Sequence, residues 1–447
     1  MRQPPALSRW LAGTRARGDA RRVIASTGYQ VAGRLISVAA ALATVVAMSR
    51  HLGPAGYGEY AYVVAFVGFF APLIWMGLDT IVIRELAKPG GDDARLMAVV
   101  MSLKVVLATV AAALATAWAF LAEVDARRVL VLIAVPTLWA AALSARGLVF
   151  QARLDMAPRL VADTLPAILL CGATLALVSM GSSVTGFVVA FSAATILGAV
   201  VLVWLSKRAL PLALSPDIAA WRTLLATAAP LGLAGVFYQV YYRVDILILE
   251  HLRGAASVGV YALAYGLVDQ SRAFFALLAM SLFPVMVRRR SEQGGFPTVM
   301  GLGVSLGVGA GIIAIVVVWL AGGWLVSLLY GAAYAGTADA LSVLSISLPM
   351  GFANFVLSYA VATLDKQHLS WRITLLAAIA NVALNVALVP TLDYLGSSYA
   401  TVATEALVFV LMSALVVRSL VGERRAVQAW PMRLTVRDPE ARPDRRP

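Results

Sequence analysis

Charged side chains are scarce in this sequence of 447 residues. Asp, Glu, Lys and Arg together make up 13% of it, whereas hydrophobic residues make up 61%. Soluble domains contain about 25% charged and roughly 45–50% apolar residues. A soluble fold with so little charge would lack the polar side chains that its surface needs. The composition, with a mean hydropathy of +0.85, therefore excludes a water-soluble globular protein and predicts a membrane protein.

Cysteine and histidine are also rare. Cys171 is the single cysteine, so the sequence has no disulfide framework. The three histidines, His51, His251 and His368, do not have the spacing of metal ligands. The chain also lacks a Gly-x-x-x-x-Gly-Lys-Ser/Thr phosphate-binding loop. We therefore expect no metal, no cofactor, no covalent catalysis and no ATPase activity.

Long apolar runs are abundant. They extend for about 20 residues and are apolar on every side, the length that a helix needs to cross ~30 Å of hydrocarbon. The strands of a membrane barrel would alternate over ~10 residues instead. We predict twelve transmembrane helices, at residues 28–50, 57–78, 96–122, 128–149, 160–180, 184–206, 224–249, 258–286, 299–322, 338–363, 370–390 and 397–421.

Positive charge predicts the orientation of these helices. The chain has 36 Lys and Arg against 23 Asp and Glu, a balance that suggests nucleic acid in a soluble protein. Here the basic residues gather in alternate connections, with Arg84, Arg153 and Arg208 among them. By the positive-inside rule, both termini are cytoplasmic and the number of spans is even. We expect a multi-pass protein of the plasma membrane with no nucleic-acid partner.

Two stretches about 200 residues apart resemble each other. Each begins with His-Leu, at His51 and His251, and continues into Gly-x-Tyr-Ala, at Gly58 and Gly259. Six helices lie in each half, so the repeats are parallel. The predicted fold is all-α, with two parallel six-helix lobes around a central cavity. A chance recurrence of a small-residue loop is the alternative. The expected division is a basic cytoplasmic segment (1–27), an N-lobe (28–206), a linker (207–223), a C-lobe (224–421) and a disordered tail (422–447).

Ionisable residues inside the predicted spans are candidates for function. A charge at mid-bilayer costs about 2.5–3.5 kcal/mol on insertion scales, so such residues usually face a cavity or a partner. The cations fit an anionic phosphate headgroup, because a guanidinium stays protonated and matches phosphate oxygens. The acids can couple ion movement or form ion pairs that hold helices together. The substrate-binding candidates are Arg34, Arg243, Arg272 and Lys104, and the coupling or ion-pair candidates are Asp245, Asp269 and Glu405.

The sequence leaves the partners of these charges open. Asp269 and Arg272 are three residues apart and can pair within one helix, and Asp245 can pair with Arg272 instead. Arg34 has no carboxylate three or four residues away, which favours a cavity position. The tyrosines at 238, 241, 242, 261 and 265 favour an interfacial belt, and contact with sugar rings is the alternative. Asn381 and Asn385 are predicted to bond a neighbouring helix.

Several segments together resemble the oligosaccharide (polysaccharide, O-antigen type) flippases of the multidrug/oligosaccharidyl-lipid/polysaccharide exporter superfamily. These are LGPAGYGEYAY after the first span, RVDILILEHLRGAASVGVYALAYGLVD across the seventh and eighth, LFPVM at 282–286, and residues 328–405 with Asn354 and Asn381. The resemblance implies a MATE-like transporter in a bacterial inner membrane. It would flip a polyprenyl-pyrophosphate-linked oligosaccharide, with polysaccharide polymerase and glycosyltransferases as further partners.

Three other functions compete with this interpretation. A drug/cation antiporter of the same superfamily would need an acidic cavity, whereas the candidate in the first span is Arg34 and the inward charge balance leans basic. A lipid II flippase commonly has fourteen spans, and twelve are predicted here. A membrane-embedded glycosyltransferase or polymerase usually needs a large outer catalytic loop, and the outer loops predicted here are short. We therefore expect a transporter rather than an enzyme.

Overall fold

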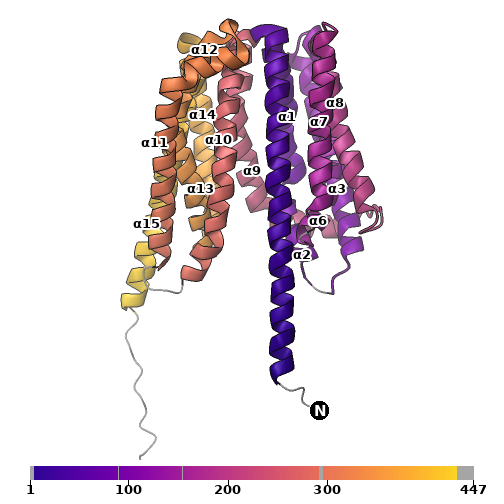
Figure 1. Cartoon of the computed structure of the whole chain (residues 1–447), viewed down its shortest axis with the longest axis vertical. Helices are drawn as coiled ribbons and strands as arrows, with labels where there is room; N and C mark the ends of the chain where they lie inside the picture. The colour runs from indigo at the N-terminus through magenta and orange to yellow at the C-terminus, as the bar shows by residue number, and fades with distance from the viewer. Residues whose placement is uncertain (1–4, 89, 154, 291–294, 430–447) are drawn as a thin grey trace, which may run out of the picture.

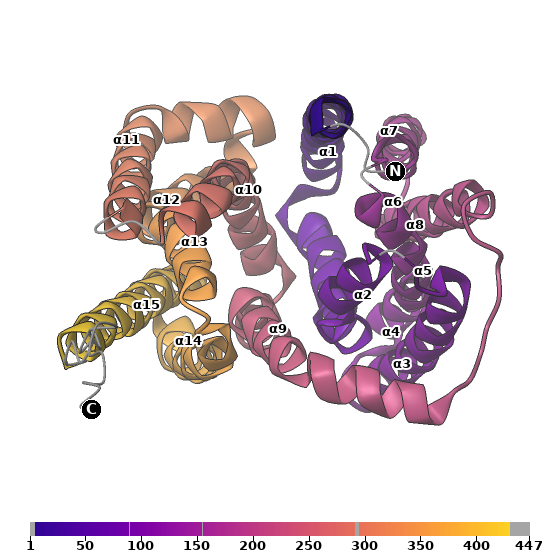
Figure 2. The same ribbon diagram turned by 90° about the horizontal axis from the view of Figure 1, so that it is seen from below.

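The computed structural model describes residues 5–88, 90–153, 155–290 and 295–429, with side chains between residues 33 and 422. Within these ranges the chain forms helices joined by short loops, and no strand is present. Figures 1 and 2 show two groups of helices side by side. The N-lobe contains α1 (Pro5–Trp75), α2 (Leu78–Leu86), α3 (Asp93–Ala122), α4 (Asp125–Ala134), α5 (Thr137–Leu143), η1 (Ser144–Gly147), α6 (Leu148–Ala152), α7 (Ala157–Ser179) and α8 (Val184–Ser206).

The C-lobe follows a coil that connects α8 to α9. It contains α9 (Ile218–Arg253), α10 (Ala255–Arg289), α11 (Gly295–Tyr330), η2 (Ala332–Tyr334), α12 (Ala335–Ser345), α13 (Leu348–Thr363), η3 (Gln367–Leu369), α14 (Ser370–Leu392) and α15 (Tyr394–Ala429). The first residues of α9 lie against the N-lobe, where Trp221 donates to the carbonyl of Val99 over 3.2 Å. The rest of α9 packs on α14 (Figure 2).

The predicted membrane spans all fall on helices. Ten helices in the described ranges are long and apolar enough to cross a membrane, and α12 with α13, bent by 47°, forms an eleventh. Among the ten, the part of α1 whose side chains are described, Gly33–Trp75, is 43 residues long, about twice the length of one crossing. At Gly53 the backbone leaves the helical conformation, with φ 66° and ψ 179°, so α1 consists of two helical arms.

The two arms of α1 run in opposite directions. In the first arm, Gly33 lies against Leu160 near the start of α7, and His51 contacts the carbonyl of Ser182 just after the end of α7. In the second arm, Gly58 lies against Ala255 after the end of α9, and Gly77, two residues past the end of this arm, lies against Ala228 near the start of α9. The first arm is therefore parallel to α7 and the second is antiparallel to α9. The first arm corresponds to the predicted span 28–50, and the second arm corresponds to the predicted span 57–78.

The ends of the helices differ from the expected bounds in three places. The fourth span is divided into α4, α5, η1 and α6, with a break at Pro136, because proline cannot donate a backbone hydrogen bond. The basic segment predicted for 1–27 is helical from Pro5 as part of α1. Helix α15 continues eight residues beyond 421, to Ala429, and the remainder of the predicted disordered tail lies outside the described residues. The lobe bounds themselves stay a prediction.

The two lobes meet closely at one end, next to the repeated motifs. A Cβ on Gly58 would lie 1.7 Å from the carbonyl oxygen of Ala255, and one on Gly259 would lie 2.1 Å from that of Pro54. The glycines of the two repeats therefore pack against each other's backbone. At the same end, Arg50 donates to the carbonyl of Leu329 over 2.8 Å. We call this the closed end.

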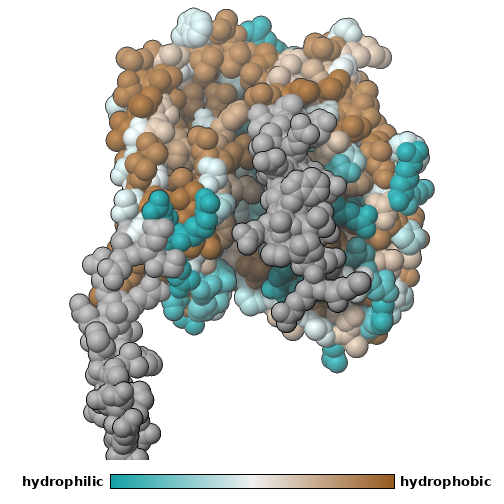
Figure 3. Space-filling model, turned by 60° about the horizontal axis from the view of Figure 1, so that its bottom comes forward, coloured by the Kyte–Doolittle hydropathy of each residue, from teal (hydrophilic) through white to brown (hydrophobic). Residues whose placement is uncertain are grey.

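The outer surface of the molecule has the composition expected of a lipid-facing protein. Large apolar side chains such as Leu121, Leu278 and Leu320 are exposed. In Figure 3 apolar residues cover much of the sides, and hydrophilic residues gather mainly along the lower edge. The chain is therefore a multi-pass membrane protein.

Candidate functional site: a charged cavity

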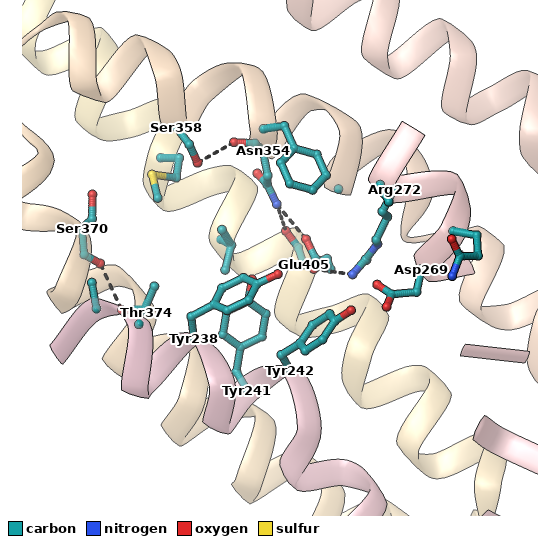
Figure 4. Close-up of a pocket in the computed structure, with 18 of the residues that line it drawn as sticks. Tyr238, Tyr241, Tyr242, Asp269, Arg272, Asn354, Ser358, Ser370, Thr374 and Glu405 are labelled. Atoms are coloured by element: carbon teal, nitrogen blue, oxygen red, sulfur yellow. Dashed lines mark hydrogen bonds and ion pairs between the residues drawn. The ribbon is translucent and has the colours of Figure 1, made fainter. Parts of the chain in front are cut away.

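A cavity of about 490 Å³ lies among α9, α10, α13, α14 and α15, and the first arm of α1 contributes to its wall. Figure 4 shows its lining residues. Four of the seven predicted site residues line it: Arg34, Asp269, Arg272 and Glu405. They come from α1, α10 and α15. The fold thus brings together charges that are far apart in the sequence.

Arg272 and Glu405 form a buried ion pair between α10 and α15. Arg272 Nη1 lies 3.1 Å from Glu405 Oε1, and the two side chains are 7% and 6% exposed. Asn354 Nδ2 donates to Glu405 Oε2 over 2.8 Å, and Arg272 Nη2 donates to Ser347 Oγ over 3.1 Å. The carboxylate is therefore held by a neutral amide of α13, as Figure 4 shows for Asn354. The guanidinium is held by the hydroxyl of Ser347, the residue just before α13.

Arg243 and Asp269 form a second, looser pair between α9 and α10. Arg243 Nη2 lies 4.0 Å from Asp269 Oδ2. The guanidinium carbon of Arg243 also lies 4.8 Å from the centre of the Tyr242 ring, a cation–π distance. The predicted pairing of Asp269 with Arg272 within one helix is wrong. Two adjacent helices offer each residue another partner, which spacing along one helix cannot reveal.

Arg34 differs from the other arginines of the site. Its Nη2 donates to Gln270 Oε1 over 3.1 Å, and within the described residues it has no ion-pair partner. The cavity lining holds two arginines, at 34 and 272, and two carboxylates, at 269 and 405. Because Arg243 pairs with Asp269 and Arg272 pairs with Glu405, Arg34 is the lining cation without an ion-pair partner among the described residues, and it lies in the cavity as the sequence favoured.

Asp245 lies apart from the cavity lining. Its side chain accepts hydrogen bonds from the Tyr261 hydroxyl and, over 2.8 Å, from the backbone N–H of Ile246. The Tyr261 hydroxyl also lies 3.1 Å from Thr401 Oγ1 on α15. A pairing of Asp245 with Arg272, one of the two options left open, is therefore wrong. A buried tyrosine satisfies this carboxylate instead.

Lys104 lies in the N-lobe, outside the cavity. Its side chain is 1% exposed and pairs with Asp79 after the break at Gly77. The sequence did not single out Asp79, because it follows the predicted second span by one residue. The predicted contact with a neighbouring helix is confirmed for Asn381, whose Nδ2 donates to Thr404 Oγ1 on α15 over 3.3 Å. It is wrong for Asn385, whose Nδ2 donates to Asn381 within α14.

Sequence reasoning favoured the wrong location for three of the tyrosines. Tyr238, Tyr241 and Tyr242 line the cavity, and Tyr261 and Tyr265 are buried. The signal that could have separated them is spacing: 238, 241 and 242 are three and four residues apart and so share one side of a helix. That is the side of α9 that faces the charged residues.

The fold and the site define a two-lobed helical membrane protein with a charged cavity. The sequence matches the family described as "Polysaccharide biosynthesis protein" over residues 23–289. This is more than half of the chain, so the protein belongs to that family, as the resemblance predicted. A second family, MatE, matches residues 230–387. A search of curated proteins finds no match.

Solved structures share the fold at low sequence identity. An inward-facing multidrug resistance MATE family transporter has a TM-score of 0.70 at 14% identity, covering 88% of this chain and 96% of the other. The lipid II flippase MurJ in an inward closed conformation has a TM-score of 0.69 at 14% identity, covering 89% of both chains. A transporter of the same superfamily from Pyrococcus furiosus has a TM-score of 0.61 at 13% identity, covering 89% and 96%. The predicted MATE-like fold is confirmed.

Proposed function

We propose that the protein flips a polyprenyl-pyrophosphate-linked oligosaccharide across the membrane by alternating access. The observation that supports this most directly is Arg34, which lines the cavity without an ion-pair partner among the described residues. A pyrophosphate carries two or more negative charges, and arginine binds phosphate oxygens through a planar, permanently charged group. Membership of a polysaccharide biosynthesis family supports an oligosaccharide as the cargo.

The remaining charges suggest a division of roles within the proposed site. Arg272 and Arg243 are secondary headgroup contacts, because each already has a carboxylate partner that the headgroup would displace. The headgroup would separate Glu405 and Asp269 from their arginine partners, and the freed carboxylates could then couple transport to an ion or proton. Lys104 is left out of the headgroup site because it pairs with Asp79 in the N-lobe.

The cellular setting belongs to the same proposal. The protein would lie in a bacterial inner membrane with both termini in the cytoplasm, as the distribution of Lys and Arg favours. Glycosyltransferases would supply its lipid-linked substrate on the cytoplasmic side, and a polysaccharide polymerase would consume the product outside. The closed end would then face outward.

The test replaces Arg34 by glutamine in the organism from which the sequence comes. Hydrogen bonds to a charged group contribute about 1.5–3 kcal/mol, so Arg34→Gln should lower transport by roughly ten- to a hundredfold. Surface polysaccharide should fall and lipid-linked repeat units should accumulate on the cytoplasmic side, with the protein still in the membrane. Arg84→Gln is the control, since Arg84 is exposed and contacts Glu85 on its own helix. Full polymer with Arg34→Gln would rule out the proposed headgroup contact.

A drug/cation antiporter is the second candidate, because MatE matches residues 230–387. Arg34 disfavours it, since a cationic drug in the cavity would meet an arginine that has no ion-pair partner among the described residues. A deletion strain separates the two functions. Unchanged lipid intermediates together with increased drug sensitivity would support the antiporter, whereas accumulated lipid-linked oligosaccharide would support the flippase.

A further inference from the structure

One wall of the cavity is aromatic, and the proposed headgroup contact does not use it. Tyr238, Tyr241 and Tyr242 lie on one side of α9 (Figure 4). The Tyr238 and Tyr242 rings are stacked, with centroids 5.3 Å apart and an interplanar angle of 18°. Tyr241 meets Tyr238 edge to face at 5.0 Å. Tyr238 is nevertheless 40% exposed. Because Tyr238 lines the cavity and is not fully covered by the other two rings, its exposed part is available to a ligand there.

Another part of the wall carries neutral polar side chains. Asn354 and Ser358 of α13 and Ser370 and Thr374 of α14 line the same cavity. Asn354 Oδ1 is buried and has no hydrogen-bond partner in the part of the chain that the structure describes. A buried carbonyl oxygen without a partner is costly, so a donor from a ligand would stabilise it. The hydroxyl groups of Ser358 and Thr374 donate to backbone carbonyls and can still accept.

Aromatic faces beside neutral hydrogen-bonding groups match the chemistry of a sugar ring. The C–H face of a pyranose carries partial positive charge and packs on the negative face of an aromatic ring. Its hydroxyl groups can donate hydrogen bonds to Asn354 Oδ1 and to the Ser358 hydroxyl, which are both free to accept. A volume of about 490 Å³ lies in the range of roughly 300–1,000 Å³ typical of small-molecule sites. It suits a few sugar rings rather than a long chain.

We propose that Tyr238, together with Tyr241 and Asn354, forms a saccharide subsite distinct from the headgroup contact at Arg34. This inference rests on the proposed function and adds where the sugar lies. Arg34 and Gln270 hold the pyrophosphate from the side of α1 and α10, and the first sugars lie against the exposed part of Tyr238. The subsite selects lipids that carry sugar over the bare lipid pyrophosphate.

The test measures binding to the purified full-length protein in nanodiscs with two probes. One probe is undecaprenyl pyrophosphate, and the other is the lipid-linked oligosaccharide extracted from a strain that lacks this protein. Wild type should bind the glycosylated lipid more tightly. Tyr238→Ala should weaken that binding about five- to tenfold and leave undecaprenyl pyrophosphate binding unchanged. Tyr238→Phe keeps the ring and should stay within about twofold of wild type.

A matched control separates the subsite from a general loss of structure. Tyr399 on α15 is 44% exposed and does not line the cavity, so Tyr399→Ala should bind both probes as wild type does. An equal loss of both probes in Tyr238→Ala, or no loss of either, would overturn the subsite. Equal binding of the two lipids by wild type would also overturn it while leaving the headgroup proposal intact.

Failure of the proposed function has a different signature. Wild type would then bind neither lipid, and Arg34→Gln would change nothing. Tetraphenylphosphonium serves as a third probe, because a cation can also lie over tyrosine rings. Binding of this cation by wild type and its loss in Tyr238→Ala would overturn the subsite in favour of a cation site.

Discussion

At the residue scale, Arg272 and Glu405 depend on each other. Both are almost fully buried, and Glu405 is also held by Asn354. Taking two charges out of water costs several kcal/mol per ion, and their attraction offsets this only while both are present. Removing one leaves an uncompensated charge, whereas removing both leaves an apolar contact.

This dependence predicts an order of stabilities. Arg272→Met or Glu405→Leu alone should destabilise the protein by about 3–5 kcal/mol. The double variant should be clearly more stable than either single one, although transport should suffer. Thermal unfolding of the purified proteins in one detergent measures this. Additive losses in the double variant would show that the two side chains do not act as a pair.

For these charged residues, the sequence predicted which side chains belong to the site but not which side chains pair with each other. Charges in apolar spans identified Arg34, Asp269, Arg272 and Glu405 as site candidates, and all four line one cavity. Their partners could not be predicted, because helical spacing gives neighbours within a helix only. Glu405 is 133 positions away from Arg272 in the chain, and only the packing of α10 against α15 brings them together.

At the scale of the elements, glycines decide where helices turn and where they touch. The twelve spans followed from apolar run lengths, and each falls on helix. The turn expected between the first two spans, at residues 51–56, is the place where the backbone of Gly53 leaves the helical conformation and divides α1 into its two arms. The repeat at Gly58 and Gly259 was visible in the sequence, but only the structure places the two motifs against each other.

The glycine contact predicts opposite effects of the same substitution along one helix. Gly→Ala inside a helix is usually favourable by about 1 kcal/mol. Gly58→Ala and Gly259→Ala should instead destabilise the closed end, because the added Cβ would meet backbone atoms at 1.7 and 2.1 Å. Gly68→Ala in α1 and Gly266→Ala in α10 are the matched controls, since neither Cβ has an atom within 4 Å.

Thermal unfolding and transport check this prediction together. Gly58→Ala and Gly259→Ala should lower the melting temperature and the transport rate, while both controls stay at or above wild type. Equal behaviour of Gly259→Ala and Gly266→Ala would mean that the lobes do not need the close approach at the closed end.

At the scale of the whole molecule, the closed end is also held by charge. Arg127 of α4 pairs with Glu250 at the end of α9, so this ion pair joins the two lobes. Glu123, which accepts from the Tyr62 hydroxyl, lies 3.5 Å from Arg127 and keeps it in place from within the N-lobe. The proposed alternating access would require this end to open, and the ion pair would then break in each transport cycle.

Neutralising Glu250 should therefore shift the protein towards opening at this end. A cysteine at Ser358, which lines the cavity, reports the opening in a Cys171→Ser background. Glu250→Gln should increase its labelling by an impermeant maleimide from outside about tenfold, if the pair contributes ~1.4 kcal/mol to closure. Asp125→Asn is the control, since it breaks the pair with Arg128 inside the N-lobe at a side chain that is 95% exposed. Labelling that rises equally in both variants would reflect a general loosening, and labelling that rises in neither would show that the packed glycines hold this end without the ion pair.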